Sequence, residues 1–218
     1  MAARAVHRVA PLTTLDLIAN ERRRVADLLD GLDDAQWATP SLCEGWTVRD
    51  VAAHLTAGWS FPKLRFARLM VRHRGFDGAN AVTARVLAER PTAEIVADLR
   101  RNADNPFAPP IVGLVAQLAD VITHGQDIAR PLGLEHEVDP AAVRPALDLS
   151  VSRKAGLVSP TNHRDGVRFV TEDQDWMWGS GAEVTGSSTS ILLALLGRAA
   201  AVDALDGPGV AALRSRLV

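Results

Sequence analysis

Residues 111–131, IVGLVAQLADVITHGQDIARP, form a clearly apolar segment with the pattern of a helix. Apolar side chains recur at helical spacing through this segment, and a proline ends it. Asp120 and His124 stand in the middle of the apolar pattern, four residues apart, so a helix would place them on one face. Asp127 follows three residues later, on nearly the same face. A carboxylate and an imidazole at this spacing can bind one divalent ion.

Three segments before this one carry the same helical periodicity. Residues 13–31 are expected to form one helix. A second should begin at Thr47, where Asp50 completes a variant of the capping box, and it should run to about residue 72. Residues 72–80 are polar and glycine-containing and are expected to form a connection. Residues 80–104 are expected to form one or two helices broken near Pro91. Antiparallel packing of about four such helices predicts a four-helix bundle.

The pattern changes after residue 133. A helix is predicted over residues 139–158, followed by a β-hairpin in the alternating stretch 166–181 and a further short strand or turn over 182–188. Residues 187–207 are predicted to be helical, and a last short helix should start at Pro208. The expected fold class is therefore mainly α. Its domains would be a helix bundle over residues 1–135 and a small α+β carboxy-terminal region over 136–218, packed on the bundle.

Composition excludes several classes of function. The 218 residues include 24 Lys and Arg against 26 Asp and Glu, a net charge of -2, so no basic excess suggests nucleic acid. The longest apolar run, near residues 191–197, is too short to cross a bilayer. Cys43 is the single cysteine, which excludes an intrachain disulfide and favours the cytoplasm. We therefore expect a cytoplasmic protein without nucleic-acid or membrane partners.

Two of the six histidines differ from the rest, because His54 and His124 lie inside apolar helical segments. With Asp120 they would supply two nitrogens and one oxygen, which leaves the fourth position of a tetrahedral zinc site open for catalysis. The alternative is that the histidines are hydrogen-bonded core residues and that the aspartate orients a ring. The other four histidines lie in polar segments and are expected to be solvated: His7, His73, His136 and His163.

Residues 37–55, WATPSLCEGWTVRDVAAHL, resemble the amino-terminal signature of the mycothiol-dependent maleylpyruvate isomerase family, a branch of the DinB-like metal-binding bundles. The run from Asp120 to Ile128 is similar to the family's second signature, a carboxylate four residues before a His-Gly-x-Asp sequence. The tail from residue 166, including LLGR and DGPGVAAL, resembles the family's small carboxy-terminal region. The three motifs occur in order and cover nearly the whole chain.

The resemblance implies a DinB-like four-helix bundle in which His54, Asp120 and His124 hold a divalent metal, usually zinc. It further implies that the metal activates the thiolate of mycothiol, the low-molecular-weight thiol of actinobacteria. The family's best-studied type has Glu where this chain has Asp120, whose side chain is one methylene shorter. The single thiol, Cys43, could act as a nucleophile, but we expect it to be a small buried residue beside Trp46.

The leading prediction is a metal-dependent, mycothiol-using transferase or isomerase that attacks a small electrophile, as a monomer or homodimer. The alternatives are a metal-dependent hydrolase with metal-bound water and a non-catalytic metal-binding stress or regulatory module. Arg198, in the LLGR segment, could pair with a carboxylate of the substrate or of the thiol cofactor. It could equally tie the carboxy-terminal helix to the bundle. The five tryptophans are expected to be packing groups, with Trp59 near enough to His54 to border the site.

Overall fold

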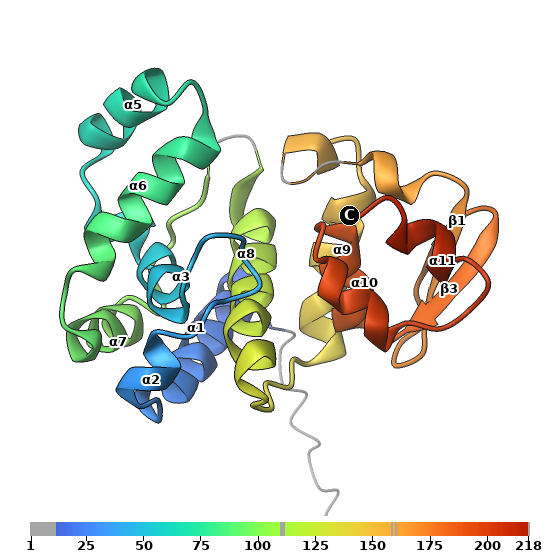
Figure 1. The fold of residues 1–218 in the computed structure, drawn as a ribbon, viewed down its shortest axis with the longest axis horizontal. Helices are drawn as coiled ribbons and strands as arrows, with labels where there is room; N and C mark the ends of the chain where they lie inside the picture. The colour runs from blue at the N-terminus through green and yellow to red at the C-terminus, as the bar shows by residue number, and fades with distance from the viewer. Residues whose placement is uncertain (1–11, 110–111, 158, 160, 218) are drawn as a thin grey trace, which may run out of the picture.

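A computed structural model of the chain describes residues 12–109, 112–157, 159 and 161–217. Most of the described residues are helical, and one small sheet lies in the carboxy-terminal part (Figure 1), so the predicted mainly α fold is confirmed. The described residues of the amino-terminal part form the helices α1 (Thr14–Asp30), α2 (Asp34–Trp37), α3 (Val48–His54), α4 (Ala57–Ser60), α5 (Lys63–Arg72), α6 (Phe76–Ala88), α7 (Thr92–Arg101) and α8 (Gly113–Ala129).

Four of these helices pack around a common core. Helix α1 contacts α7 and α8, and α3 contacts the same two helices, so α1, α8, α3 and α7 form a closed ring of neighbours. Helix α6 packs on α3, and α5 packs on α6 at the outer edge of the molecule (Figure 1). Apolar residues on the inner helix faces are fully buried, among them Ile18, Val51, Ile95 and Ile122. None of the helices in the described part of the chain is long and apolar enough to cross a membrane.

Capping boxes fix where the bundle helices begin. The Thr47 hydroxyl accepts a hydrogen bond from the Asp50 amide, and the Asp50 carboxylate accepts one from the Thr47 amide at 2.9 Å. The predicted start of this helix is thus confirmed, and the cap places His54 at the end of the second turn of α3. Helix α1 begins in the same way, at a box formed by Thr13 and Asp16, and ends at Gly31 as predicted.

The predicted continuous helix from Thr47 to about residue 72 is wrong. The chain breaks after His54 into α3, α4 and α5. The Thr56 hydroxyl donates to the Ala53 carbonyl at 2.8 Å, and Pro62, which lacks an amide hydrogen, precedes α5. The connection predicted over residues 72–80 is shorter than expected, because α6 already begins at Phe76. The predicted break near Pro91 is confirmed, since α6 ends at Ala88 and α7 begins at Thr92.

The carboxy-terminal part begins with α9 (Pro140–Val151), which ends seven residues before the predicted end at 158. Strands β1 (Val167–Thr171) and β2 (Met177–Gly179) form the predicted antiparallel hairpin. Strand β3 (Ala182–Gly186) pairs with the other edge of β1 in parallel, giving the order β2-β1-β3. The predicted helix over 187–207 is confirmed only as α10 (Ser188–Leu195) and a 3-10 helix, η4 (Ala199–Ala204), separated by Gly197 at φ +88°. The last helix, α11 (Val210–Arg214), begins two residues after the predicted Pro208.

Helix α9 joins the two parts of the chain, because it contacts α8 on one side and α10 on the other. Buried apolar residues of the bundle and of the carboxy-terminal part consequently belong to one hydrophobic cluster. Helices α9 and α10 lie beside α8 in Figure 1, and the sheet lies on their far side. The carboxy-terminal part therefore covers one flank of the helix that carries Asp120 and His124.

A second link between the parts contradicts the prediction that His136 is solvated. The His136 side chain is 5% exposed, and its Nε2 lies 2.6 Å from the Glu21 carboxylate on α1. The ring also packs on α8 at Gly125, where an added Cβ would lie 2.6 Å from His136 Nε2. Only glycine leaves room for the ring at this close approach.

His163 is likewise buried, contrary to prediction, and its Nε2 lies 3.1 Å from the Leu195 carbonyl oxygen. His73 is exposed as predicted, and His7 lies outside the described residues.

Candidate metal centre

Three predicted ligands come together between α3 and α8. His54 ends α3, while Asp120 and His124 lie one turn apart on α8. Asp120 Oδ1 is 3.6 Å from His54 Nε2 and 3.4 Å from His124 Nε2. The two imidazole rings meet edge to face with their centroids 5.0 Å apart. One ligand atom from each residue thus lies within 4.8 Å of the other two.

The spacing of these atoms fits a metal ion better than direct hydrogen bonds. Separations of 3.4 and 3.6 Å exceed the usual N–H···O distance of about 2.7–3.2 Å. Tetrahedral zinc with bonds of about 2.0–2.1 Å would hold its ligand atoms roughly 3.3–3.4 Å apart. Two imidazole nitrogens and one carboxylate oxygen are also a ligand set that zinc uses. The residues present therefore fit a divalent ion.

The cluster is open to solvent on one side. The side chains of His54 and His124 are 13% and 12% exposed, whereas that of Asp120 is 34% exposed. The second oxygen of Asp120 accepts a hydrogen bond from Gln117 Nε2 at 3.1 Å, which fixes the rotation of the carboxylate. An additional ligand would reach the cluster past Asp120.

Electrostatics couple the members of the cluster. Burial by itself raises the pKa of Asp120, but the neighbouring His124 and His54 more than offset this effect and hold the pKa well below its usual value. Burial likewise lowers the pKa of His124, while Asp120, Asp127 and Cys43 outweigh it and raise the pKa well above its usual value. The cluster thus attracts positive charge, whether that charge is a proton or a cation.

A second group of polar side chains lies behind His124. Asp127 is fully buried, and its Oδ2 lies 2.9 Å from His124 Nδ1. Arg198 binds Asp127 in a bidentate manner, with Nε donating to Oδ1 at 3.1 Å and Nη2 to Oδ2 at 2.7 Å. Burial alone would raise the pKa of Asp127, but His124 and then Arg198 outweigh it and hold the pKa well below its usual value. Arg198, which follows α10, therefore lies against α8, and Asp127 stands between its guanidinium and the proposed ligand His124.

Cys43 belongs to this second group. Its thiol donates to Asp127 Oδ2 at 3.1 Å, and its sulfur lies 3.7 Å from His124 Nδ1 and 3.4 Å from Arg198 Nη2. The Leu42 amide donates to the Asp127 carbonyl at 3.2 Å and holds the Cys43 loop against α8. The sequence favoured a small buried residue at this position, whereas the thiol is half-buried and contacts three polar groups of the site.

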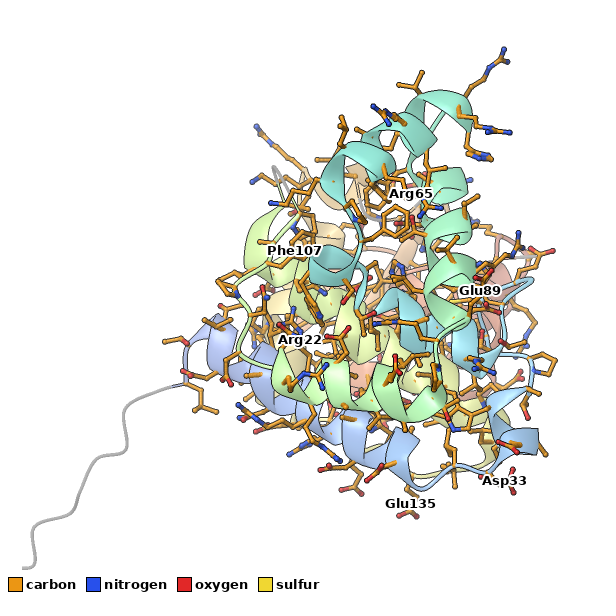
Figure 2. All side chains as sticks on the ribbon, turned by 90° about the vertical axis from the view of Figure 1, so that its left-hand side faces the viewer. Arg22, Asp33, Arg65, Glu89, Phe107 and Glu135 are labelled. Atoms are coloured by element: carbon orange, nitrogen blue, oxygen red, sulfur yellow. The ribbon has the colours of Figure 1, made fainter. Side chains whose placement is uncertain are left out.

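Aromatic side chains support the cluster from the side of α3. The Trp46 ring meets the His54 ring edge to face, with centroids 5.3 Å apart. His54 Nδ1 is buried and has no hydrogen-bond partner among the described residues, so packing rather than hydrogen bonding orients this ring. Trp59 instead packs under the guanidinium of Arg22, a buried side chain of α1 (Figure 2), and donates to Asp98 at 3.2 Å.

Comparison with known proteins gives two kinds of match. Residues 18–108 match the family model described as the mycothiol maleylpyruvate isomerase N-terminal domain. The fold is similar to the crystal structure of a mycothiol-dependent maleylpyruvate isomerase, at 15% identity and a TM-score of 0.60, over 89% of this chain and 91% of that one. The crystal structure of a mutant of that isomerase matches at 15% identity with a TM-score of 0.58, over the same shares of both chains. A search of curated proteins finds no match.

These matches confirm the family resemblance that the sequence motifs indicated. The matched segment includes Cys43, Trp46 and His54, and it ends before Asp120 and His124. At 15% identity, the structural similarity shows that both parts of the chain share the fold of the isomerase.

Proposed function

We propose that this chain is an enzyme, a divalent-metal-dependent transferase or isomerase that uses mycothiol to attack a small electrophile. The observation that carries the proposal is the convergence of His54 Nε2 and His124 Nε2 on Asp120 Oδ1, at 3.6 and 3.4 Å. The match of residues 18–108 to the mycothiol maleylpyruvate isomerase N-terminal domain supports the choice of thiol. We further propose zinc as the metal, because it accepts this nitrogen and oxygen ligand set.

His54, Asp120 and His124 would hold the ion and leave one position accessible from the exposed side of Asp120. A zinc ion bound there would keep a coordinated thiol deprotonated near neutral pH. The histidines would bind through Nε2 as neutral rings, since metal binding requires a free lone pair. Because the Asp120 side chain is short, direct binding requires that α8 stay close to α3, and the contact between these helices supplies that closeness.

Asp127 would orient His124 for this role. A carboxylate that accepts the Nδ1 hydrogen of a histidine leaves the lone pair on Nε2 and fixes the rotation of the ring. The separation of 2.9 Å between Asp127 Oδ2 and His124 Nδ1 suits such a bond. Arg198 balances the buried charge of Asp127 and keeps it aimed at His124.

We propose that Arg198 also borders the substrate site. Two of its nitrogens bind Asp127 and Nη1 donates to the Leu196 carbonyl at 3.1 Å, yet 22% of its side chain remains exposed. This exposed portion could attract a carboxylate of the electrophile or of the thiol. We also propose that residues 1–135 and 136–218 are the two domains of the chain, with Arg198 reaching from the second to the first.

Metal analysis of the purified protein is the first test. We expect about one divalent ion per chain, as in other three-ligand catalytic sites. His54→Ala and His124→Ala should lose the ion, whereas His73→Ala, which alters an exposed histidine outside the cluster, should retain it. A wild-type protein without a stoichiometric ion would exclude the proposal.

The second test is transfer of mycothiol to a chlorinated aromatic dye or a bimane electrophile. We expect thiol-dependent product formation that disappears in His54→Ala. Activity that survives this substitution would refute the proposed mechanism. Cleavage of esters or amides without thiol would instead support a hydrolase, and a bound ion with neither activity would support a non-catalytic module.

A further inference from the structure

Helix α5 is the least buried long helix of the bundle. None of its ten residues is buried, and it lies at the outer corner of the molecule, on the side away from α9 and α10 (Figure 1). Its inner face rests on α6 through Phe66 and Leu69, which are partly buried, and the Phe66 ring meets the Phe76 ring at 5.6 Å. The remaining circumference of α5 faces solvent.

The exposed surface of α5 is strongly cationic. Residues 63–74 contain no acidic side chain and five basic ones, Lys63, Arg65, Arg68, Arg72 and Arg74, although the whole chain has a net charge of -2. Arg68 lies three residues after Arg65 and four before Arg72, so these three arginines form a stripe along one side of the helix (Arg65 is labelled in Figure 2). No carboxylate on α5 itself neutralises the stripe.

Large apolar side chains lie beside the arginines and also face solvent. Val71 is 82% exposed and Leu64 is 66% exposed, and the interval of seven residues places them on the same face. Met70 is 37% exposed and lies about 100° around the helix from Val71, on the side of Phe66. Bulky aliphatic side chains beside a cationic stripe are the pattern of helices that lie in the interface of a membrane.

We propose that α5 is a docking element for an anionic lipid surface, on which it lies parallel to the membrane plane. Leu64 and Val71 would enter the region between headgroups and acyl chains, and the arginine stripe would contact lipid phosphates. The projecting position of α5 lets a flat surface approach without contact with the carboxy-terminal part (Figure 1). The sequence-based expectation of no membrane partner rested on the lack of a spanning segment, which a surface helix does not need.

Other occupants fit the surface less well. A second copy of the chain paired through the same face would set one arginine stripe against another, at an electrostatic cost. Nucleic acid would account for the arginines but would leave Leu64 and Val71 without a role. An anionic lipid surface satisfies both the charge and the exposed apolar side chains.

Vesicle flotation of the full chain tests the proposal. We expect binding to vesicles of phosphatidylcholine with about one-third phosphatidylglycerol, weaker binding at high salt, and little binding to phosphatidylcholine alone. The Arg65→Glu, Arg68→Glu and Arg72→Glu triple variant should lower the partition coefficient by at least about 100-fold. Val71→Asp should lower it by about tenfold or more through loss of apolar insertion.

A matched control separates a docking site from general charge attraction. Arg153→Glu, Arg168→Glu and Arg216→Glu change the net charge equally at exposed positions outside α5, and binding should stay within about twofold of wild type. Circular dichroism and thiol transfer in solution should be unchanged in the α5 variants, which shows that they fold. The proposal is overturned if the wild type does not bind anionic vesicles, or if the control triple variant loses as much binding as the α5 triple variant. Neither outcome depends on whether the enzyme uses mycothiol.

Discussion

The buried carboxylate of Asp127 offers the sharpest test of how the site is held. It accepts two hydrogen bonds from Arg198 and one from the Cys43 thiol. It also lies within hydrogen-bond distance of His124 Nδ1. The substitution Asp127→Asn keeps the shape of the side chain and removes its charge. One asparagine oxygen cannot replace two carboxylate oxygens, and its amide hydrogens would face the guanidinium of Arg198.

Two separate losses follow from the contacts. Breaking a buried ion pair typically costs about 3–5 kcal/mol, and we expect about 3 kcal/mol here because the Arg198 side chain is 22% exposed. For a chain of this size that loss corresponds to a fall in Tm of about 6–12 °C. Loss of an orienting partner of a metal-bound histidine typically weakens metal binding about 10–100-fold. Zinc affinity should therefore fall by that factor.

The two effects require two assays. Urea unfolding of the metal-free protein measures the free energy of unfolding without any contribution from the ion. Competition for zinc with a chromophoric chelator measures the dissociation constant of the folded protein. Asp203→Asn is the matched control, because Asp203 and Arg214 form an exposed pair at 2.6 Å, and its loss should cost less than about 1 kcal/mol.

Two outcomes would contradict the roles assigned to Asp127. A loss of unfolding free energy below about 1 kcal/mol would show that the Arg198 pair does not stabilise the fold. Unchanged zinc affinity would show that Asp127 does not position His124. The double variant Asp127→Asn/Arg198→Met should be more stable than Asp127→Asn alone, because it removes the uncompensated charge of the guanidinium.

Three further predictions concern the bundle and the proposed zinc ion. Gly125→Ala should destabilise the protein by about 1–3 kcal/mol, because the new methyl group would lie 2.6 Å from His136 Nε2. The control Gly156→Ala adds its methyl group in open space and should leave thermal unfolding nearly unchanged. Burial raises the pKa of Asp98, but hydrogen bonds from Ser60, Arg90 and Trp59 outweigh it and lower the pKa, so Asp98 stabilises the fold above about pH 4 and less below it. Asp98→Asn should then be less stable than wild type at neutral pH, and the difference in urea midpoint should shrink as the pH falls below about 4; a constant difference would contradict this assignment. Removing zinc with a chelator should lower Tm by about 5–11 °C if free zinc stood at about 100 times Kd, and His54→Ala should show no such shift.

Local rules were enough to predict the parts of the site that lie on single helices. The spacing of Asp120 and His124 on α8 and the capping box at Thr47 act over a few residues, and the structure confirms both as local features. The approach of His54 to α8 depends on helix packing, and only the family resemblance connected it with the other two residues before the structure did.

The missed features depend on contacts between distant parts of the chain. Cys43 reaches Asp127 because a loop is held by a backbone hydrogen bond to α8, which no spacing in the sequence signals. His136 lies in a polar stretch of sequence, which predicts a solvated side chain. In the fold its ring nitrogen Nε2 instead lies 2.6 Å from the Glu21 carboxylate on α1. The position of Asp127, three residues after His124, already placed it on nearly the same face of the helix, but this spacing gave no sign of its contacts with Cys43 and Arg198.

The contact between Gly125 and His136 also limits how this sequence can change. A side chain at position 125 and an imidazole at position 136 cannot occupy the same space, because the first Cβ atom would already lie 2.6 Å from the ring nitrogen. Sequences that share this packing should therefore vary at the two positions together, with a residue larger than glycine accompanied by a small side chain at 136. In a related sequence, the pair of residues at these two positions would therefore indicate whether the segment after α8 still folds back over the helix beside His124.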